Sequence, residues 1–232
     1  MLNNQVKTKY RISIHPFMKR LLDILFSLLL LVVCFPIGII IYWRVKKHVG
    51  KPVFIKQLHV GENGKPFTRI QFRTRVHASS VIHAFPPQPL SRTWLRGVPD
   101  SVVFTKEMTG LLSQVGIFLK KYHLHHLPEL LHVIKGDMSL VGPHPEIIEV
   151  AAHYNETQRK RLTTKPGIMG LSQLKGYTYQ QHSKMIKEDL IYVEKKSIWF
   201  DLKIMGCVLI RYPNRYQNKR HILTWYDRSI GE

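Results

Sequence analysis

The longest apolar stretch of the chain runs from Ile24 to Trp43 without a charged residue. At about 1.5 Å per residue, these roughly 20 residues would reach about 30 Å as a helix, which is the thickness of a membrane's hydrocarbon core. Pro36 lies inside the stretch, and a proline bends a helix because it lacks an N–H and clashes with the preceding turn. Basic residues flank the stretch on both sides: Lys19 and Arg20 precede it, and Arg44, Lys46 and Lys47 follow it.

A membrane-spanning helix normally has its basic excess on one side only. The flanks therefore favour a re-entrant helix, bent at Pro36, that enters and leaves the membrane on the same face. A simple spanning helix is the alternative, and a signal peptide is disfavoured because the stretch is too long and no small-residue cleavage site follows. Asp23 lies one turn after Lys19, so it can pair with this lysine or cap the helix at the surface.

Two short apolar strands follow the anchor. The segments 53–60 and 67–72 flank a polar stretch that contains Asn63 and Gly64, and Asn-Gly is a strong signal for a hairpin turn. Together they predict a β-hairpin that ends in Phe72-Arg73-Thr74.

Helical periodicity returns from Leu111 to Leu127 and is interrupted by Pro128. A second apolar helix is predicted after the proline, until Gly136 ends it. His125 and His126 thus fall at a helix junction, where free backbone N–H groups suit an anion. Near the C-terminus, an apolar stripe with lysines and a tryptophan between Asp189 and Ile210 predicts either an interfacial membrane helix or a core helix.

The chain carries 35 Lys and Arg against 15 Asp and Glu, a net charge of +20, so its partners are expected to be anionic. Anionic membrane lipids, phosphorylated substrates and nucleic acid all meet this condition, but no nucleic-acid-binding module accompanies the charge. Two cysteines are too few for a disulfide framework. We expect one anchor region, residues 1–50, and one cytoplasmic domain, residues 51–232.

Three motifs are the most specific features of the chain. The first runs from Gly136 to Pro143, GDMSLVGP, and the second from Lys165 to Gln173, KPGIMGLSQ. The third is Phe72-Arg73-Thr74. All three resemble motifs of the bacterial sugar transferases, the small monotopic phosphoglycosyltransferases. The resemblance implies an α+β fold: a mainly helical membrane-associated domain with a small β-hairpin, an N-terminal re-entrant helix and a C-terminal interfacial helix.

The resemblance also implies a function: transfer of a sugar-1-phosphate from a UDP-sugar to polyprenyl (undecaprenyl) phosphate, which initiates surface polysaccharide or glycoconjugate synthesis. The expected location is the bacterial cytoplasmic membrane, with the domain facing the cytoplasm. No nucleic acid is expected as a partner, and homo-oligomers or pathway glycosyltransferases are left open as protein partners. Residues that bind substrate phosphate are expected at four positions: Arg73, Lys120, His144 and Lys165.

The catalytic positions differ from the family pattern. His125 and His126 stand where the family has an Asp-Glu dyad, whose aspartate is the nucleophile and whose carboxylates engage Mg²⁺. His144 stands where the family has an arginine, and Lys120 likewise replaces an arginine. Imidazole is a poor ligand for Mg²⁺, which prefers oxygen. The family therefore predicts Mg²⁺, whereas the dyad argues against it.

Three carboxylates near the signature remain as catalytic or metal candidates. Glu129 replaces a glutamine and could be a relocated acid or a solvated helix-start carboxylate, while Asp137 and Glu146 match the family and could hold a metal. A histidine metal site is disfavoured because no helical metal motif is present. Two functions stay open: an active transferase with altered chemistry, and a catalytically impaired pseudoenzyme that acts as a membrane binding or scaffold protein.

Overall fold

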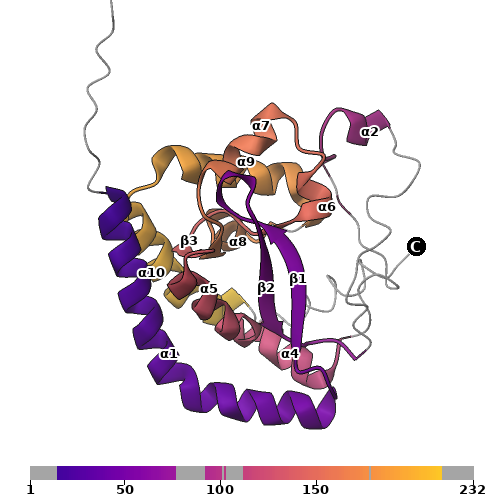
Figure 1. Cartoon of the computed structure of the whole chain (residues 1–232), viewed down its shortest axis with the longest axis vertical. Coiled ribbons are helices and arrows are strands. Elements are labelled where there is room, and N and C mark those ends of the chain that lie inside the picture. The colour runs from indigo at the N-terminus through magenta and orange to yellow at the C-terminus, as the bar shows by residue number, and fades with distance from the viewer. Residues whose placement is uncertain (1–14, 77–91, 101, 103–111, 178, 216–232) are drawn as a thin grey trace, which may run out of the picture.

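The computed structural model describes residues 15–76, 92–100, 102, 112–177 and 179–215 (Figure 1). Helix α1 (His15–His48) runs along one edge of the molecule and then turns beneath it. Pro36 lies inside this helix and accounts for the bend, since it removes a backbone hydrogen bond and crowds the preceding turn. Among the described residues, one helix, Pro16–His48, is long and apolar enough to cross a membrane by length and composition.

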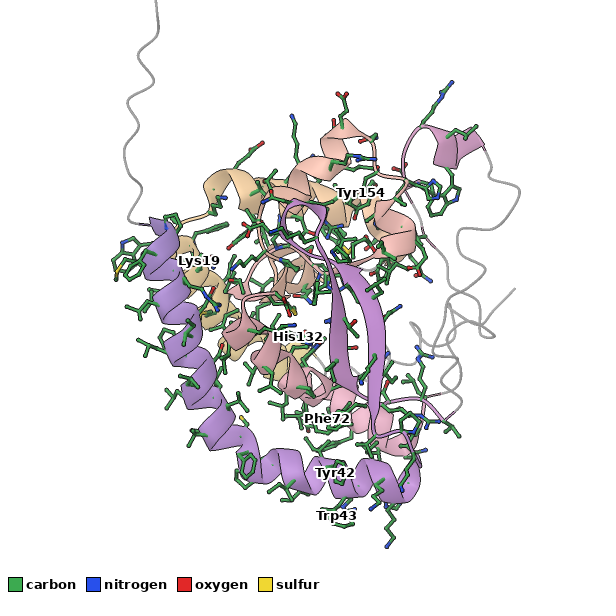
Figure 2. All side chains as sticks on the ribbon, in the orientation of Figure 1. Lys19, Tyr42, Trp43, Phe72, His132 and Tyr154 are labelled. Carbon is green, nitrogen blue, oxygen red and sulfur yellow. The ribbon has the colours of Figure 1, made fainter. Side chains whose placement is uncertain are left out.

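The apolar side chains of α1 are largely exposed. Val32 is 74% exposed, Phe35 is 63% exposed and Trp43 is 59% exposed. Tyr42 points from the second half of α1 toward Phe72, whereas Trp43 points away from the rest of the chain (Figure 2). A surface of this kind is unfavourable in water.

The predicted hairpin is confirmed as β1 (Phe54–Val60) and β2 (Pro66–Phe72), which pair antiparallel. Its turn contains the short helix η1 (Glu62–Gly64). Asn63 and Gly64 both adopt positive φ, at 56° and 78°, the conformation that makes Asn-Gly a favoured turn sequence. Strand β4 (Glu146–Ile147) pairs antiparallel with β1 and extends the hairpin to three strands.

The predicted helix junction is also confirmed. Helix α4 (Gln114–Lys121) leads into the 3₁₀ helix η2 (Leu124–Glu129), which contains Pro128, and α5 (Leu130–Lys135) follows directly. Gly136 ends α5 with φ at 103°, a value that favours glycine.

Two motif segments pair with each other as strands. Strand β3 (Ser139–Val141) lies parallel to β5 (Gly167–Met169). A Cβ atom on Gly167 would lie 2.1 Å from the backbone N of Gly142. The backbones of these two segments can therefore approach this closely only if position 167 is glycine. The glycine-rich segment at 165–173 therefore contains a strand and a close backbone crossing.

The C-terminal segment forms two helices, whereas the apolar stripe between Asp189 and Ile210 predicted one. Helix α9 (His182–Lys195) ends before α10 (Ile198–Arg215) begins, and Asp189, Tyr192 and Ile204 are buried. Core packing thus accounts for much of the apolar stripe, although Trp199 on α10 is 82% exposed. The remaining short helices are α2 (Arg92–Leu95), α6 (Ile148–Ala151), α7 (Glu156–Arg159), η3 (Lys160–Thr163), α8 (Leu171–Lys175) and η4 (Tyr179–Gln181).

Three groups of buried apolar residues hold these elements together. The second half of α1 packs on the hairpin and α4 through Ile41, Val45, Phe72 and Leu119, among others. A second group joins β2, α5, β3, α9 and α10, and a third joins β1, β4, α6 and α9. The helix junction η2 lies between the first and second groups, with Leu127 packed against both.

Candidate active site

Strand β2 supplies two polar side chains that face the helix junction. Arg69 and Gln71 follow Phe67 at alternate positions of β2, and alternate residues of a strand share one face. Phe67 and Arg69 are buried and Gln71 is half-buried. The polar pair therefore sits on the side of the strand that packs against η2.

Glu129, the last residue of η2, is completely buried and is held by this pair. Its carboxylate oxygens lie 2.8 Å and 3.0 Å from Nη2 of Arg69. Gln71 donates from Nε2 to Oε1. Although burial alone would raise the pKa of Glu129, the charges of Arg69 and His126 and their hydrogen bonds hold this pKa well below its usual range. Glu129 is thus an ionised, buried carboxylate, and the reading of it as a solvated helix-start residue is wrong.

The histidines of η2 lie against this carboxylate. Nδ1 of His126 is 2.6 Å from Oε1 of Glu129. The rings of His125 and His126 are 3.8 Å apart between centroids, and His123 is 5.9 Å from His126. Burial, followed by the charges of His126 and Lys120, lowers the pKa of His125 well below its usual range. The backbone N–H of His126 donates to the carbonyl of His123 at 3.1 Å, so this N–H is occupied rather than directed at an anion.

A second buried network lies beneath His144. The guanidinium of Arg161 contacts Glu146 at 3.3 Å, the hydroxyl of Tyr154 at 2.6 Å, and the carboxylate of Asp189. It also donates to the carbonyl of His144 at 2.7 Å, and the N–H of His144 donates to Asp189 at 3.2 Å. Arg161 and Asp189 therefore fix the backbone at position 144.

Arg69 influences both networks. Burial first, and then the positive charges of Arg69 and Arg161, lower the pKa of His144 to about 3. Burial and then the charge of Arg69 also lower the pKa of His59 on β1 to about 3. His144 is consequently neutral at pH 7, and it cannot supply the permanent charge of the arginine that the family has at this position.

Arg73 was expected to bind phosphate, but its guanidinium is occupied by the protein backbone. It is 7% exposed and donates to the carbonyls of Lys51, Arg75 and Val76. In this conformation Arg73 joins the end of β2 to the segment after α1. Phosphate binding by Arg73 stays a prediction, and it would require these hydrogen bonds to open.

The other two predicted phosphate ligands lie at different ends of α5. Lys120 lies in the last turn of α4, next to the helix junction, and burial, followed by the charge of Arg75, lowers its pKa to about 7. Lys165 lies near the opposite end of α5, where a Cβ atom on Gly136 would be 3.7 Å from Nζ of Lys165 and 3.2 Å from Nη2 of Arg20. Phosphate binding by Lys120 and Lys165 stays a prediction.

The carboxylates proposed as metal ligands are engaged in separate groups. Asp137 accepts from Nδ1 of His132 at 3.2 Å and pairs with Lys135 at 3.3 Å. Glu146 accepts from Tyr154, Arg161 and His182; these contacts outweigh burial and lower its pKa to about 2. Within the described part of the chain, no group of three or more His, Cys, Asp or Glu side chains is arranged to hold a metal ion.

Mg²⁺ therefore does not fit the described residues well, because the available carboxylates already have cationic or hydrogen-bonding partners and the dyad offers nitrogen ligands. The metal roles of Asp137 and Glu146 stay predictions.

Sequence reasoning missed several residues of this site. Arg69 and Gln71 could have been found from their alternate spacing on a predicted strand that ends in the Phe72-Arg73-Thr74 motif. Arg161, Asp189 and His182 gave no comparable signal, because they come from distant segments and only their burial reveals them.

Comparison with known proteins gives a consistent result. Residues 14–211 match the family model described as bacterial sugar transferase. The uncharacterized sugar transferase EpsL of Bacillus subtilis is 36% identical over 194 residues, which cover 84% of this chain and 86% of EpsL. The galactosyl transferase CpsE of Streptococcus agalactiae is 34% identical over 193 residues, which cover 82% of this chain and 41% of CpsE.

A third relative has a more specific name. The UDP-glucose:undecaprenyl-phosphate glucose-1-phosphate transferase of Klebsiella pneumoniae is 32% identical over 205 residues, which cover 83% of this chain and 39% of that protein. The chain therefore spans less than half the length of two of these three relatives, and most of the length of EpsL.

Proposed function

The chain belongs to the bacterial sugar transferase family, and on that premise we propose that it transfers a sugar-1-phosphate from a UDP-sugar to polyprenyl phosphate. The Klebsiella pneumoniae relative is named for this reaction, with UDP-glucose and undecaprenyl phosphate as substrates. The product would initiate a surface polysaccharide or glycoconjugate. A net charge of +20 suits two substrates that carry phosphate groups and a membrane with anionic lipids.

The observation that carries the proposal is the connection between the apolar anchor and the motif strands. Asp23 of α1 accepts a hydrogen bond from the hydroxyl of Ser139 on β3, and β3 pairs with β5. Arg20 of α1 donates to the carbonyls of Val133 and Ile134 at the end of α5. The second half of α1 also packs with Leu124 and Leu127 of η2. A lipid-linked phosphate held at a membrane by α1 would therefore lie close to the motif strands and to the element that carries the catalytic positions.

We further propose that α1 is a re-entrant anchor in the bacterial cytoplasmic membrane, with the domain on the cytoplasmic side. Three features support this topology: the bend at Pro36, the basic residues on both flanks, and the exposure of the apolar side chains between them. We also propose homo-oligomers or pathway glycosyltransferases as protein partners.

A second function, that of a catalytically impaired pseudoenzyme, is favoured by a different observation. Arg69 forms an ion pair with the buried Glu129 and Gln71 donates a hydrogen bond to it, so this carboxylate is already engaged. The dyad positions carry imidazoles in place of carboxylates. Such a protein could retain affinity for nucleotide-sugar or polyprenyl phosphate and act as a binding or scaffold protein in the same pathway.

One experiment separates the two functions. The purified full chain in lipid nanodiscs is incubated with UDP-glucose, UDP-galactose or UDP-N-acetylglucosamine and undecaprenyl phosphate, and UMP release is measured, with the Klebsiella pneumoniae relative as the assay control. Release of UMP that depends on undecaprenyl phosphate supports the transferase. Binding of a UDP-sugar without UMP release supports the pseudoenzyme, and failure to bind any of the donors or the lipid contradicts both.

A further inference from the structure

His126 forms a carboxylate-imidazole pair with Glu129. Nδ1 of His126 lies 2.6 Å from Oε1 of Glu129, and the two residues are three positions apart within η2. Nδ1 is also 3.0 Å from Nε2 of Gln71 and 3.2 Å from Nη2 of Arg69. At 2.6 Å from an ionised carboxylate, Nδ1 must carry the proton, because two lone pairs would repel each other at this distance. The lone pair of His126 is therefore on Nε2.

Nε2 of His126 is the nitrogen left for chemistry. Because Nδ1 donates its proton to Glu129, the nearby N–H groups of Gln71 and Arg69 are directed at the same carboxylate rather than at this nitrogen. No ring contact of His126 within the described residues involves Nε2, and the side chain retains 12% exposure. A carboxylate that holds one ring nitrogen and leaves the other for a reacting atom is the arrangement by which proteins activate histidine.

His125 lacks this support. Its Nδ1 contacts the carbonyl of Leu119 at 3.3 Å, which is a neutral acceptor. A ring nitrogen that bonds to phosphorus leaves the imidazole with positive charge. Glu129 contacts His126 directly and can stabilise that charge. At His125, burial first and then the charges of His126, Lys120 and His123 disfavour a positive ring, and Glu129 opposes them only in part.

We propose that Nε2 of His126 is the nucleophile of this transferase and that Glu129 is its positioning residue. The inference rests on the proposed function. The lone pair of Nε2 forms a bond to the sugar-bearing phosphorus of the UDP-sugar, while the bond from that phosphorus to the bridging oxygen breaks and its electron pair leaves with UMP. An oxygen of polyprenyl phosphate then attacks the same phosphorus, the nitrogen–phosphorus bond breaks, and its electron pair returns to Nε2. The proton on Nδ1 stays with the His126–Glu129 pair in both steps.

Arg69 supplies a second observation at this site. It is 6% exposed, and its Nε–H is buried without an acceptor in the part of the chain that the structure describes. A buried donor without an acceptor is unfavourable. An oxygen of the substrate's diphosphate is an acceptor of suitable charge for it, on the same residue that holds Glu129.

The test traps the covalent intermediate. The full chain in nanodiscs is mixed with UDP-glucose, UDP-galactose or UDP-N-acetylglucosamine, each labelled in the sugar, without polyprenyl phosphate, and is quenched at alkaline pH. We expect UMP release of one equivalent or less, and a sugar-phosphate adduct on His126 within the tryptic peptide 122–135, labile to acid and stable to alkali, whereas an adduct on a carboxylate would be labile to alkali. Undecaprenyl phosphate added before the quench should discharge the adduct.

Variants separate the two roles. His126→Gln should abolish the adduct, whereas His153→Gln, a histidine that packs against Trp94, should form it as the wild type does. Glu129→Gln should lower the single-turnover rate on the order of 10²-fold or more with little change in the dissociation constant for the UDP-sugar, and Glu129→Asp should recover part of that rate. Loss of binding and rate together in both Glu129 variants would overturn the positioning role.

Other outcomes are equally decisive. An adduct on His125 or on a carboxylate, or transferase turnover that survives His126→Gln, would overturn the nucleophile and leave the proposed function intact. Absence of UMP release from every donor in the presence of undecaprenyl phosphate, while the Klebsiella pneumoniae relative is active, would overturn both.

Discussion

The carboxylate of Asp23, on the long apolar helix α1, accepts a hydrogen bond of 2.8 Å from the hydroxyl of Ser139 on strand β3. Asp23 also accepts from the backbone N–H of Leu140 at 3.2 Å. The side chains of Asp23 and Ser139 are both buried. The expected pairing of Asp23 with Lys19 is present at 3.9 Å, but Lys19 lies closer to Asp201 of α10, at 2.6 Å. Lys19 and Asp23 thus form a structural joint between α1, β3 and α10.

The first prediction tests this joint. Ser139→Ala should lower the free energy of unfolding by about 1–3 kcal/mol, because Asp23 would lose a buried partner. Asp23→Asn should also destabilise the protein, and the double variant should lose less than the sum of the two single losses. Denaturant unfolding in detergent measures these values. Ser27→Ala is the matched control, since Ser27 is buried and its hydroxyl has no partner among the described residues; an equal loss in this control would contradict the prediction.

The second prediction concerns the crossing of β3 and β5. Gly167→Ala should lower the free energy of unfolding by about 3 kcal/mol or more, because the new Cβ would meet the backbone of Gly142 at 2.1 Å. Gly206→Ala in α10 should instead be neutral or stabilising by up to about 1 kcal/mol, since no atom lies within 4 Å of its Cβ position. Thermal unfolding compares the two variants, and similar melting temperatures would show that the strands can separate without cost.

The third prediction concerns the acid sensitivity of the fold. Burial and the charge of Arg69 lower the pKa of His59 to about 3, so between about pH 6.5 and pH 3 the unfolded chain binds a proton at this histidine that the folded chain does not. Stability from this group is therefore present above pH 6.5 and is lost as the pH falls. His59→Gln should reduce the slope of the unfolding free energy by about 1.4 kcal/mol per pH unit in this range. His48→Gln, at an exposed position, should leave the slope unchanged.

The fourth prediction concerns metal dependence. UMP release by the wild type should respond little to EDTA, because His125 and His126 offer no oxygen ligands for Mg²⁺. The combined change His125→Asp, His126→Glu and His144→Arg should create or raise Mg²⁺-dependent UMP release, as it restores the carboxylates and the arginine of the family pattern. His153→Asp controls for the added charge. Mg²⁺-dependent turnover of the wild type that EDTA abolishes would contradict this prediction.

The fifth prediction concerns topology. Tags at residue 1 and residue 232 should both be protected from an external, membrane-impermeant reagent in intact cells, because basic residues flank both ends of the apolar stretch. Pro36→Leu should expose the first tag in part of the molecules, since it removes the cause of the bend. An exposed first tag in the wild type would establish a spanning helix.

Local structure was largely predictable from the residues. The Asn63-Gly64 turn, the interruption at Pro128 and the end of α5 at Gly136 follow from backbone preferences that a single residue imposes on its neighbours. The apolar stretch around Pro36 likewise predicted a long helix with a bend. The family resemblance rested on motifs of this local kind and is confirmed by the match over residues 14–211.

The sequence by itself determined the hairpin, the helix junction, the long apolar helix, the positive charge and the presence of imidazoles at the dyad positions. The tertiary structure alone decided which groups surround those imidazoles. Arg69 and Glu129 are 60 positions apart, and their buried ion pair rules out one of the two readings left open for Glu129, that of a solvated carboxylate. Arg73, expected to face a phosphate, donates to backbone carbonyls instead. The reason is physical: the charge state and the available hydrogen bonds of a side chain depend on burial and on neighbours from distant segments, and these are set only when the chain packs.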